Sequence, residues 1–177
     1  NISKYLNLNT MLSYAVNKWT SDVDAYVRPE SNPTDEIKYR AYTNRLYVGD
    51  YPMTTASIGV LYKTPLSRSI DFFLYPIYNF YGRYYAKFDP ELRIDENDKG
   101  KQSWRIPDFY NVDLHTGLKL RFPNFIIKSL NLSFDIFNLF NKENIIDAID
   151  GTTHDSKSAR VWFGNERYWN ISLSAEI

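Results

Sequence analysis

The stretch "YNVDLHTGLKLRF" (Tyr110–Phe122) alternates between apolar and polar residues over its whole length. The even positions are Tyr110, Val112, Leu114, Thr116, Leu118, Leu120 and Phe122. The odd positions are Asn111, Asp113, His115, Gly117, Lys119 and Arg121. Because successive side chains of a β-strand point to opposite faces, this pattern predicts a strand with one apolar and one polar face.

Five further segments show the same alternation, at about residues 5–20, 54–63, 70–81, 130–136 and 169–177. In the third of these, Pro76 stands among the apolar residues, and a proline inside a strand indicates an edge or a bulge. The connections are alternately short, as at "TPLSRS" and at Pro123-Asn124, and long and polar, as in "PESNPTDEIKYR" with Pro29 and Pro33. Such alternation is typical of outer-membrane β-barrels.

Composition excludes several kinds of protein. The 177 residues include 21 Lys plus Arg and 21 Asp plus Glu, so no excess of positive charge suggests nucleic-acid binding. The absence of Cys excludes a disulfide framework, a thiolate metal site and a cysteine nucleophile. No apolar run approaches the roughly 18 residues of a transmembrane helix. The 17% of aromatic residues favours strands over helices.

Strand length favours a lipid-facing sheet over a soluble one. Tyr110 and Phe122 end one apolar face, and at roughly 3.3 Å per residue and a tilt of about 40° they stand about 30 Å apart along a barrel axis. An outer-membrane barrel needs an apolar band about 25 Å tall. Strands of soluble proteins more typically run about five or six residues.

Six strands are too few for a closed barrel, since single-chain outer-membrane barrels begin at about eight. An open sheet would expose its edge backbone groups to lipid, which the hydrocarbon region does not allow. The sequence opens on Asn1-Ile2-Ser3 with no signal peptide. We therefore expect an all-β, antiparallel, up-and-down transmembrane barrel of which residues 1–177 form about six C-terminal strands.

Five segments in order along residues 46–177 carry a family resemblance. They are "YVGDYPMTTASIGVLY", "YYAKFDP", "QSWRIPDFYNVDLHTGLKL", "FDIFNLFNKENIIDAIDG" and "ARVWFG". With them the chain resembles the C-terminal barrel region of TonB-dependent outer-membrane receptors of the form common in Bacteroidota. The stretch "NLFNKENI" resembles the family's penultimate-strand motif and is the most specific of the matches.

The resemblance implies a 22-stranded barrel in the outer membrane of a Gram-negative bacterium, filled by a plug domain. The plug and the N-terminal strands would lie outside residues 1–177. It implies active import of a nutrient such as a siderophore, vitamin, oligosaccharide or peptide, energised by a TonB complex that contacts the N-terminal part. The implied partners are outer-membrane lipid, the plug, the remaining strands and, as an open question, a surface lipoprotein. The resemblance also implies that the short turns are periplasmic and the long connections extracellular.

The polar face predicts the residues that line the lumen. These are Asn7, Asn9, Asp113, His115, Asn131, Asp135 and Asn170. Aromatic residues gather where long connections meet strands, namely Tyr81, Tyr84, Tyr85, Trp104, Phe109 and Trp162. We interpret them as an interfacial girdle, because Tyr and Trp tips reach lipid headgroups while their rings stay apolar. The alternative is a ligand vestibule, in which Gln102, Trp104 and Arg105 are the first choice for ligand contact.

No pattern favours an enzyme, a cofactor or a metal. Asp113 and His115 share a face, but the chain has only two histidines, and a polar wall explains the pair better than catalysis or metal binding. "RIDENDKG" contains oxygen ligands without the spacing of a calcium loop and is interpreted as a surface loop. "GTTHDSK" is also interpreted as a loop, and its Ser156 lacks the surroundings of a nucleophile elbow.

Two other functions stay open at this stage. A passive porin or structural barrel would lack the upstream plug and TonB-contacting segment, and a soluble β-sandwich binding module would not require detergent for extraction. The transported ligand cannot be chosen from the sequence, because importers of all these nutrients share the barrel.

Overall fold

The computed structural model describes residues 3–28, 30–31, 34, 36–123 and 125–177. Its main sheet is an antiparallel meander, because each strand of the sheet pairs with the next strand of the same sheet along the chain. The strands of this path are β1 (Leu6–Tyr14), β4 (Pro52–Pro65), β5 (Ile70–Tyr85), β7 (Phe109–Arg121), β8 (Ser129–Phe137) and β11 (Tyr168–Glu176). A short strand, β6 (Arg105–Ile106), pairs with the end of β5. The prediction of an all-β antiparallel fold is confirmed.

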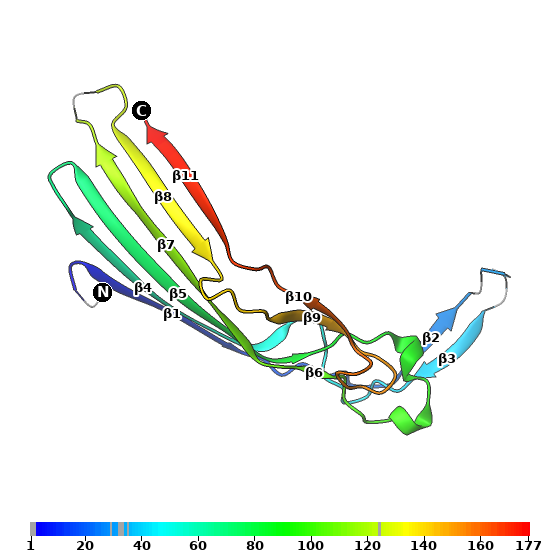
Figure 1. Ribbon diagram of the computed structural model, residues 1–177. Helices are drawn as coiled ribbons and strands as arrows, with labels where there is room; N and C mark the ends of the chain where they lie inside the picture. The colour runs from blue at the N-terminus through cyan, green and yellow to red at the C-terminus, as the bar shows by residue number, and fades with distance from the viewer. Residues whose placement is uncertain (1–2, 29, 32–33, 35, 124) are drawn as a thin grey trace.

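The register places every predicted apolar set on the same face. Opposite residues of an antiparallel pair share a face, and the pairs include Leu8 with Val60, Leu118 with Leu132 and Phe134 with Ile171. No second layer covers this face in Figure 1. Leu132 is 43% exposed and Ile171 58%.

Pro76 corrects an expectation about the third strand. It lies in β5, which is a central strand between β4 and β7, and its alternation continues in phase on both sides. Pairing with β7 runs through Pro76 and Leu114, whereas the pairing with β4 lacks partners for Val60 and Leu61. A proline lacks one backbone N–H donor, so it disturbs hydrogen bonding toward one neighbouring strand only. The gap in the pairing with β4 is the result that this loss predicts.

The connections alternate in length as predicted. The two short ones cover residues 66–69 and 122–128, the second being longer than the expected tight turn. Both termini lie at the end of the sheet where these turns are, and the long connections gather at the opposite end (Figure 1). Pro29, Pro33 and Asn124, on which some loop expectations rested, lie outside the described residues, as does the start at Asn1-Ile2.

The long connections contain structure that the sequence did not reveal. The first holds the hairpin of β2 (Val23–Val27) and β3 (Ile37–Ala41). The second holds two 3-10 turns, η1 (Pro90–Arg93) and η2 (Glu96–Asp98), and the third holds the hairpin of β9 (Ile145–Ile149) and β10 (Arg160–Phe163). The small hydrophobic core, with Tyr84, Ala86, Ile106 and Ala148, lies among these elements.

The sheet is open. Among the described residues β1 and β11 are its two edges and do not pair with each other, so the chain by itself forms no closed barrel. Within the same residues no helix is long and apolar enough to cross a membrane.

Candidate binding cleft

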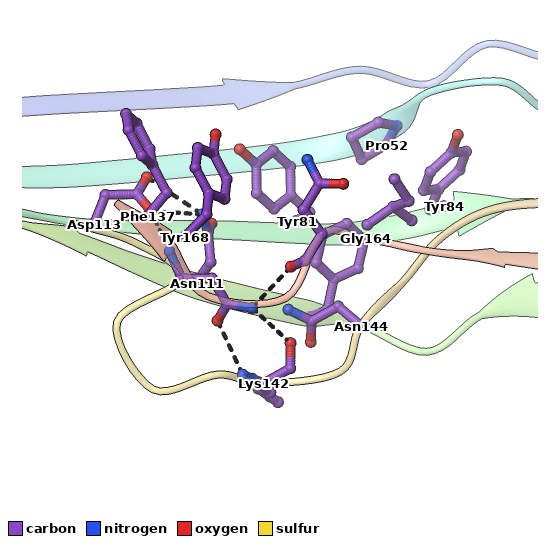
Figure 2. A pocket seen from close by; sticks show the side chains of 14 residues that line it. Pro52, Tyr81, Tyr84, Asn111, Asp113, Phe137, Lys142, Asn144, Gly164 and Tyr168 are labelled. Carbon is purple, nitrogen blue, oxygen red and sulfur yellow. Dashed lines mark hydrogen bonds between the residues drawn. The ribbon is translucent and has the colours of Figure 1, made fainter. Parts of the chain in front are cut away.

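A cleft of about 480 Å³ lies on the polar face of the sheet, at the end where the long connections gather (Figure 2). Its floor comes from β5, β7, β8 and β11, and its sides come from the segments that follow β8 and precede β11. The lining residues are Pro52, Tyr81, Tyr84, Phe109, Asn111, Asp113, Phe137, Asn138, Lys142, Asn144, Ile146, Gly164, Asn165 and Tyr168.

Two stacked aromatic pairs occupy the floor of the cleft. Tyr81 and Phe109, on neighbouring strands, have ring centroids 4.9 Å apart at 24°. Phe137 and Tyr168 have centroids 4.7 Å apart at 15°. Figure 2 shows Tyr81, Tyr168 and Phe137 in a row on the same side of the strands. Each pair is cross-strand, so the sheet itself holds the rings in position.

Tyr84 enters the cleft through a change in backbone conformation. By strict alternation its side chain would share the apolar face with Phe80. Arg83 has a positive φ of 53°, which for a residue other than glycine is uncommon, and the strand leaves its regular geometry there. Beyond this point Tyr84 is buried, and its hydroxyl bonds Asp147 Oδ1 at 3.2 Å. Its ring therefore belongs to the wall of the cleft and not to a lipid interface.

The corner that follows β8 is built by the motif "NLFN". Asn138 and Asn141 both have positive φ, 51° and 49°, a conformation that asparagine tolerates better than most residues. The Asn138 amide donates to the carbonyl oxygens of Lys142 and Asn165 and accepts from the Lys142 amide. Asn141 Oδ1 accepts from the backbone amide of Arg167 at 2.7 Å. The motif that carried the family resemblance thus ties the end of β8 to the segment entering β11.

Among the described residues, two charged side chains line the cleft. Asp113 accepts from the side-chain amides of Asn79 and Asn111 and from the backbone amide of Asn138 at 3.0 Å. The Lys142 ammonium lies 3.6 Å from the ring centroid of Tyr110. The cleft therefore offers a ligand aromatic surface, hydroxyl groups and amides, together with one carboxylate and one ammonium group.

All the predicted lumen-lining residues lie on the polar face with the cleft. His115 Nδ1 is 2.8 Å from Asp135 Oδ1, and Asn131 donates to Ser174 at 3.4 Å. Asn9 donates to the Tyr75 hydroxyl at 3.1 Å. Asn7 and Asn170 share this face by register, opposite Leu61 and Asp135. Asp113 and His115 bond different partners, which fits a hydrogen-bonded wall; that this wall faces a lumen stays a prediction.

Two glycines let aromatic rings lie flat on the polar face. A Cβ atom on Gly59 would stand 2.7 Å from the Tyr75 ring, and one on Gly117 would stand 2.6 Å from the Phe73 ring and 2.4 Å from the Leu132 carbonyl oxygen. Tyr75 and Phe73 thus cover bare backbone on neighbouring strands. This packing stiffens the middle of the sheet and was not expected from the sequence.

The residues first chosen for ligand contact lie beside the cleft in the loop layer. The Gln102 amide accepts from the backbone amide of Tyr47 and donates to the Arg45 carbonyl, so it joins two connections. Trp104 packs against the small hydrophobic core. Arg105 forms a two-pronged contact with Asp108, at 2.9 and 3.0 Å, on the surface. Contact of these three with a ligand stays a prediction.

The aromatic residues interpreted as a girdle divide into two groups. Tyr81, Tyr84 and Phe109 line the cleft, which corrects the girdle interpretation for these three. Tyr85 stacks on Tyr47 with centroids 4.4 Å apart, and Trp162 is 42% exposed in β10. The continuation of the β7 alternation to Phe109 is the signal that could have placed its ring on the polar face.

A buried ionic cluster ties the second and third connections together, and we call its members Arg93, Asp98, Asp150 and His154 the loop latch. Arg93 Nη2 is 2.5 Å from Asp150 Oδ2, with both side chains fully enclosed. His154 bridges the two carboxylates, with Nδ1 2.7 Å from Asp150 and Nε2 3.3 Å from Asp98. Asp150 also accepts from the backbone amide of Trp104.

The loop latch perturbs the ionisation of its members. Burial lowers the pKa of the Arg93 guanidinium, and the Asp150 carboxylate offsets part of that effect. Burial alone would raise the pKa of Asp98, but the Lys101 ammonium and His154 bring it below its ordinary value. The interpretation of "GTTHDSK" as a simple loop missed this cluster. Arg93 is distant from His154 in the sequence, and no local pattern near His154 indicates that the two residues meet.

In the described part of the chain, no group of three His, Cys, Asp or Glu residues is placed so that it could hold a metal ion. In "RIDENDKG", Asp95 caps η2 by accepting from the Asn97 amide, while Asp98 faces Lys101 and His154. The acidic side chains thus have separate partners within the chain.

Comparison with known proteins adds no relative. No family model matches the chain, no curated protein matches it, and no solved structure matches it.

Proposed function

We propose that this chain is part of the wall of a TonB-dependent transporter in the outer membrane of a Gram-negative bacterium. The observation that carries the proposal is the continuous apolar face over six strands, exposed on a sheet against which no element of the described residues packs. The strands β4, β5 and β7 have 14, 16 and 13 residues, long enough for a tilted strand to cross the hydrocarbon layer.

The open edges support a larger assembly. Unpaired backbone groups along β1 and β11 would need partners inside a membrane, and further strands of the same barrel would supply them. The alternation of short turns and long structured connections supports an up-and-down barrel with a periplasmic and an extracellular end. The polar face then looks inward, toward a plug domain and the imported nutrient, and the chain has no enzymatic role.

The membrane assignment is tested by accessibility on adjacent residues. Because residues 1–177 contain no Cys, Leu132→Cys and Ser133→Cys each place a single spin label in this part of the chain. The measurement uses the full-length protein in lipid vesicles, with any cysteine outside these residues replaced. We expect the label at 132 to collide with dissolved oxygen far more than with an aqueous nickel reagent. The label at 133, on the opposite face, should lack that preference. Equal access of the nickel reagent to both labels would contradict the proposal.

Two observations distinguish energised transport from passive flow: the sequence of the full gene and the rate of nutrient uptake by cells. An upstream plug domain and TonB-contacting segment in the full reading frame would support active import. Uptake that continues at the same rate in cells without the TonB complex would instead favour a passive porin or structural barrel. Extraction from cells without detergent would favour a soluble binding module.

A further inference from the structure

We infer that the cleft is a saccharide site, which binds a neutral sugar ring between its two aromatic pairs. The inference rests on the proposed function, since it takes the polar face to be the interior of a transporter. It names the class of nutrient, which neither the fold nor the sequence pattern specifies.

The first step is the lining of the cleft. Tyr81–Phe109 and Phe137–Tyr168 place two stacked aromatic pairs, which we call platforms, on adjoining strand pairs. Because the two rings of a pair cover each other's inner faces, the outer ring faces are the ones left for a ligand. Sugar rings present flat patches of C–H groups, and these pack on aromatic faces. A cleft of about 480 Å³ falls within the usual range for small-molecule sites and has room for a short oligosaccharide.

The second step is the balance of charge in the lining. Among the described lining residues the charged side chains are Asp113 and Lys142, one of each sign. Asp113 accepts from two asparagine amides and one backbone amide, and Lys142 lies over the Tyr110 ring. A phosphate or metal-chelate ligand with several charges would lose its hydration here and find at most one group of opposite charge, which is costly. The lining therefore favours a ligand without net charge.

The third step is the kind of hydrogen-bonding group that surrounds the rings. Tyr81 and Tyr168 carry hydroxyl groups beside the platforms, and Asn144 and Asn165 carry amides at the rim. Hydroxyl and amide groups both donate and accept, which matches the donor and acceptor character of sugar hydroxyls. The Asn144 nitrogen bonds the Tyr110 carbonyl, which holds this side chain at the rim. Flat apolar surface next to neutral bifunctional groups is the combination that a saccharide requires.

The test uses the full-length protein in detergent on an array of neutral and charged glycans, followed by titration of the glycans retained. We expect neutral oligosaccharides to bind. Tyr81→Ala and Phe109→Ala should each weaken binding about tenfold or more, because each removes half of a platform. Tyr81→Phe, which keeps the ring and removes only the hydroxyl group, should weaken binding less than Tyr81→Ala does.

A matched control comes from the neighbouring pair on the other face. Phe80 stands opposite Tyr110 one residue away from the Tyr81–Phe109 pair. Phe80→Ala should leave glycan affinity within about twofold, and unchanged heat-modifiable migration on gels should show that each variant folds. Binding of charged glycans alone, binding of none, or equal effects of Phe80→Ala and Tyr81→Ala would overturn the inference. The spin labels at 132 and 133 report on the membrane assignment independently, so the two proposals can fail separately.

Discussion

Removal of the Asp150 carboxylate should loosen the loop layer while leaving the main sheet in place. In Asp150→Ala the Arg93 guanidinium, which is fully enclosed, loses its one carboxylate partner within 4 Å, and Trp104 and His154 each lose an acceptor. Breaking a buried ion pair by removing one member costs about 3–5 kcal/mol, because the remaining charge stays buried without compensation. The cost falls on the connections that the loop latch joins.

Hydrogen exchange measured by mass spectrometry resolves this local effect. The backbone bonds from Lys87 to Ala148 and from Asp150 to Lys87 hold the second and third connections together. A loss of about 3–5 kcal/mol corresponds to exchange faster by about two to three and a half orders of magnitude in peptides covering 86–104 and 145–160. Peptides from β7 and β8 should change little.

The control is an ion pair on the surface of the same layer. Arg28 and Glu36 are 3.3 Å apart, with side chains 70% and 47% exposed. Glu36→Ala should cost less than about 1 kcal/mol, because exposed pairs contribute little. Replacing both buried partners, as Arg93→Met with Asp150→Leu, should restore part of the protection. If Asp150→Ala exchanged no faster than Glu36→Ala, the buried pair would not be what holds the connections together.

Three further outcomes follow from the contacts described above. Asn138→Gly should destabilise the protein by about 1–3 kcal/mol, because the side-chain hydrogen bonds are lost. Asn138→Ala should cost about 1 kcal/mol more, because alanine is strained at positive φ. Urea midpoints measured in detergent would show this order of stability, and the inverted order would contradict the reasoning. Gly117→Ala should cost about 1–3 kcal/mol, since the new methyl meets the Leu132 carbonyl, and an unchanged midpoint would refute this. Because the pKa of Asp98 is lowered, its ionised form is favoured in the folded protein: this contribution is complete above the ordinary value of 3.8 and is lost as pH falls through the lowered value. Exchange of residues 95–101 should therefore accelerate as the pH falls below the ordinary value of 3.8, and Asp98→Asn, already lacking the carboxylate, should show no such step.

The strands were predictable because their signal is local. Alternation with a period of two is carried by each strand separately, and the register then placed Leu118, Leu132 and Ile171 on one face without further information. The error at Pro76 arose because a proline disturbs only the neighbour toward which its missing donor points. From the sequence, that neighbour was unknown.

The loop layer and the cleft were less accessible to sequence reasoning. Arg93 and Asp150 are far apart in the sequence, and charged residues are usually solvated, so their burial depends on a partner that the local pattern cannot reveal. The cleft was partly visible. Tyr81 and Phe109 have the same parity as the polar residues beside them. Tyr81 already lies within the predicted segment 70–81, and extending the alternation of 110–122 by one residue reaches Phe109, so parity would have moved both rings from a girdle to the inner wall.

Alternate residues of a strand face opposite sides of the sheet. The two proposed functions, contact with lipid and contact with a ligand, therefore fall on different side chains. Phe80 and Tyr110 form one opposed pair, and Tyr81 and Phe109 form the next, yet the first pair faces outward and the second lines the cleft. Under these proposals, substitution in the outer set would act on insertion into the membrane, and substitution in the inner set would act on the ligand. The backbone and its hydrogen bonds are common to both sets, so side chains of the inner set can be replaced while strand pairing is retained. A change in ligand would then fall on the residues that line the cleft, with the outer positions left apolar.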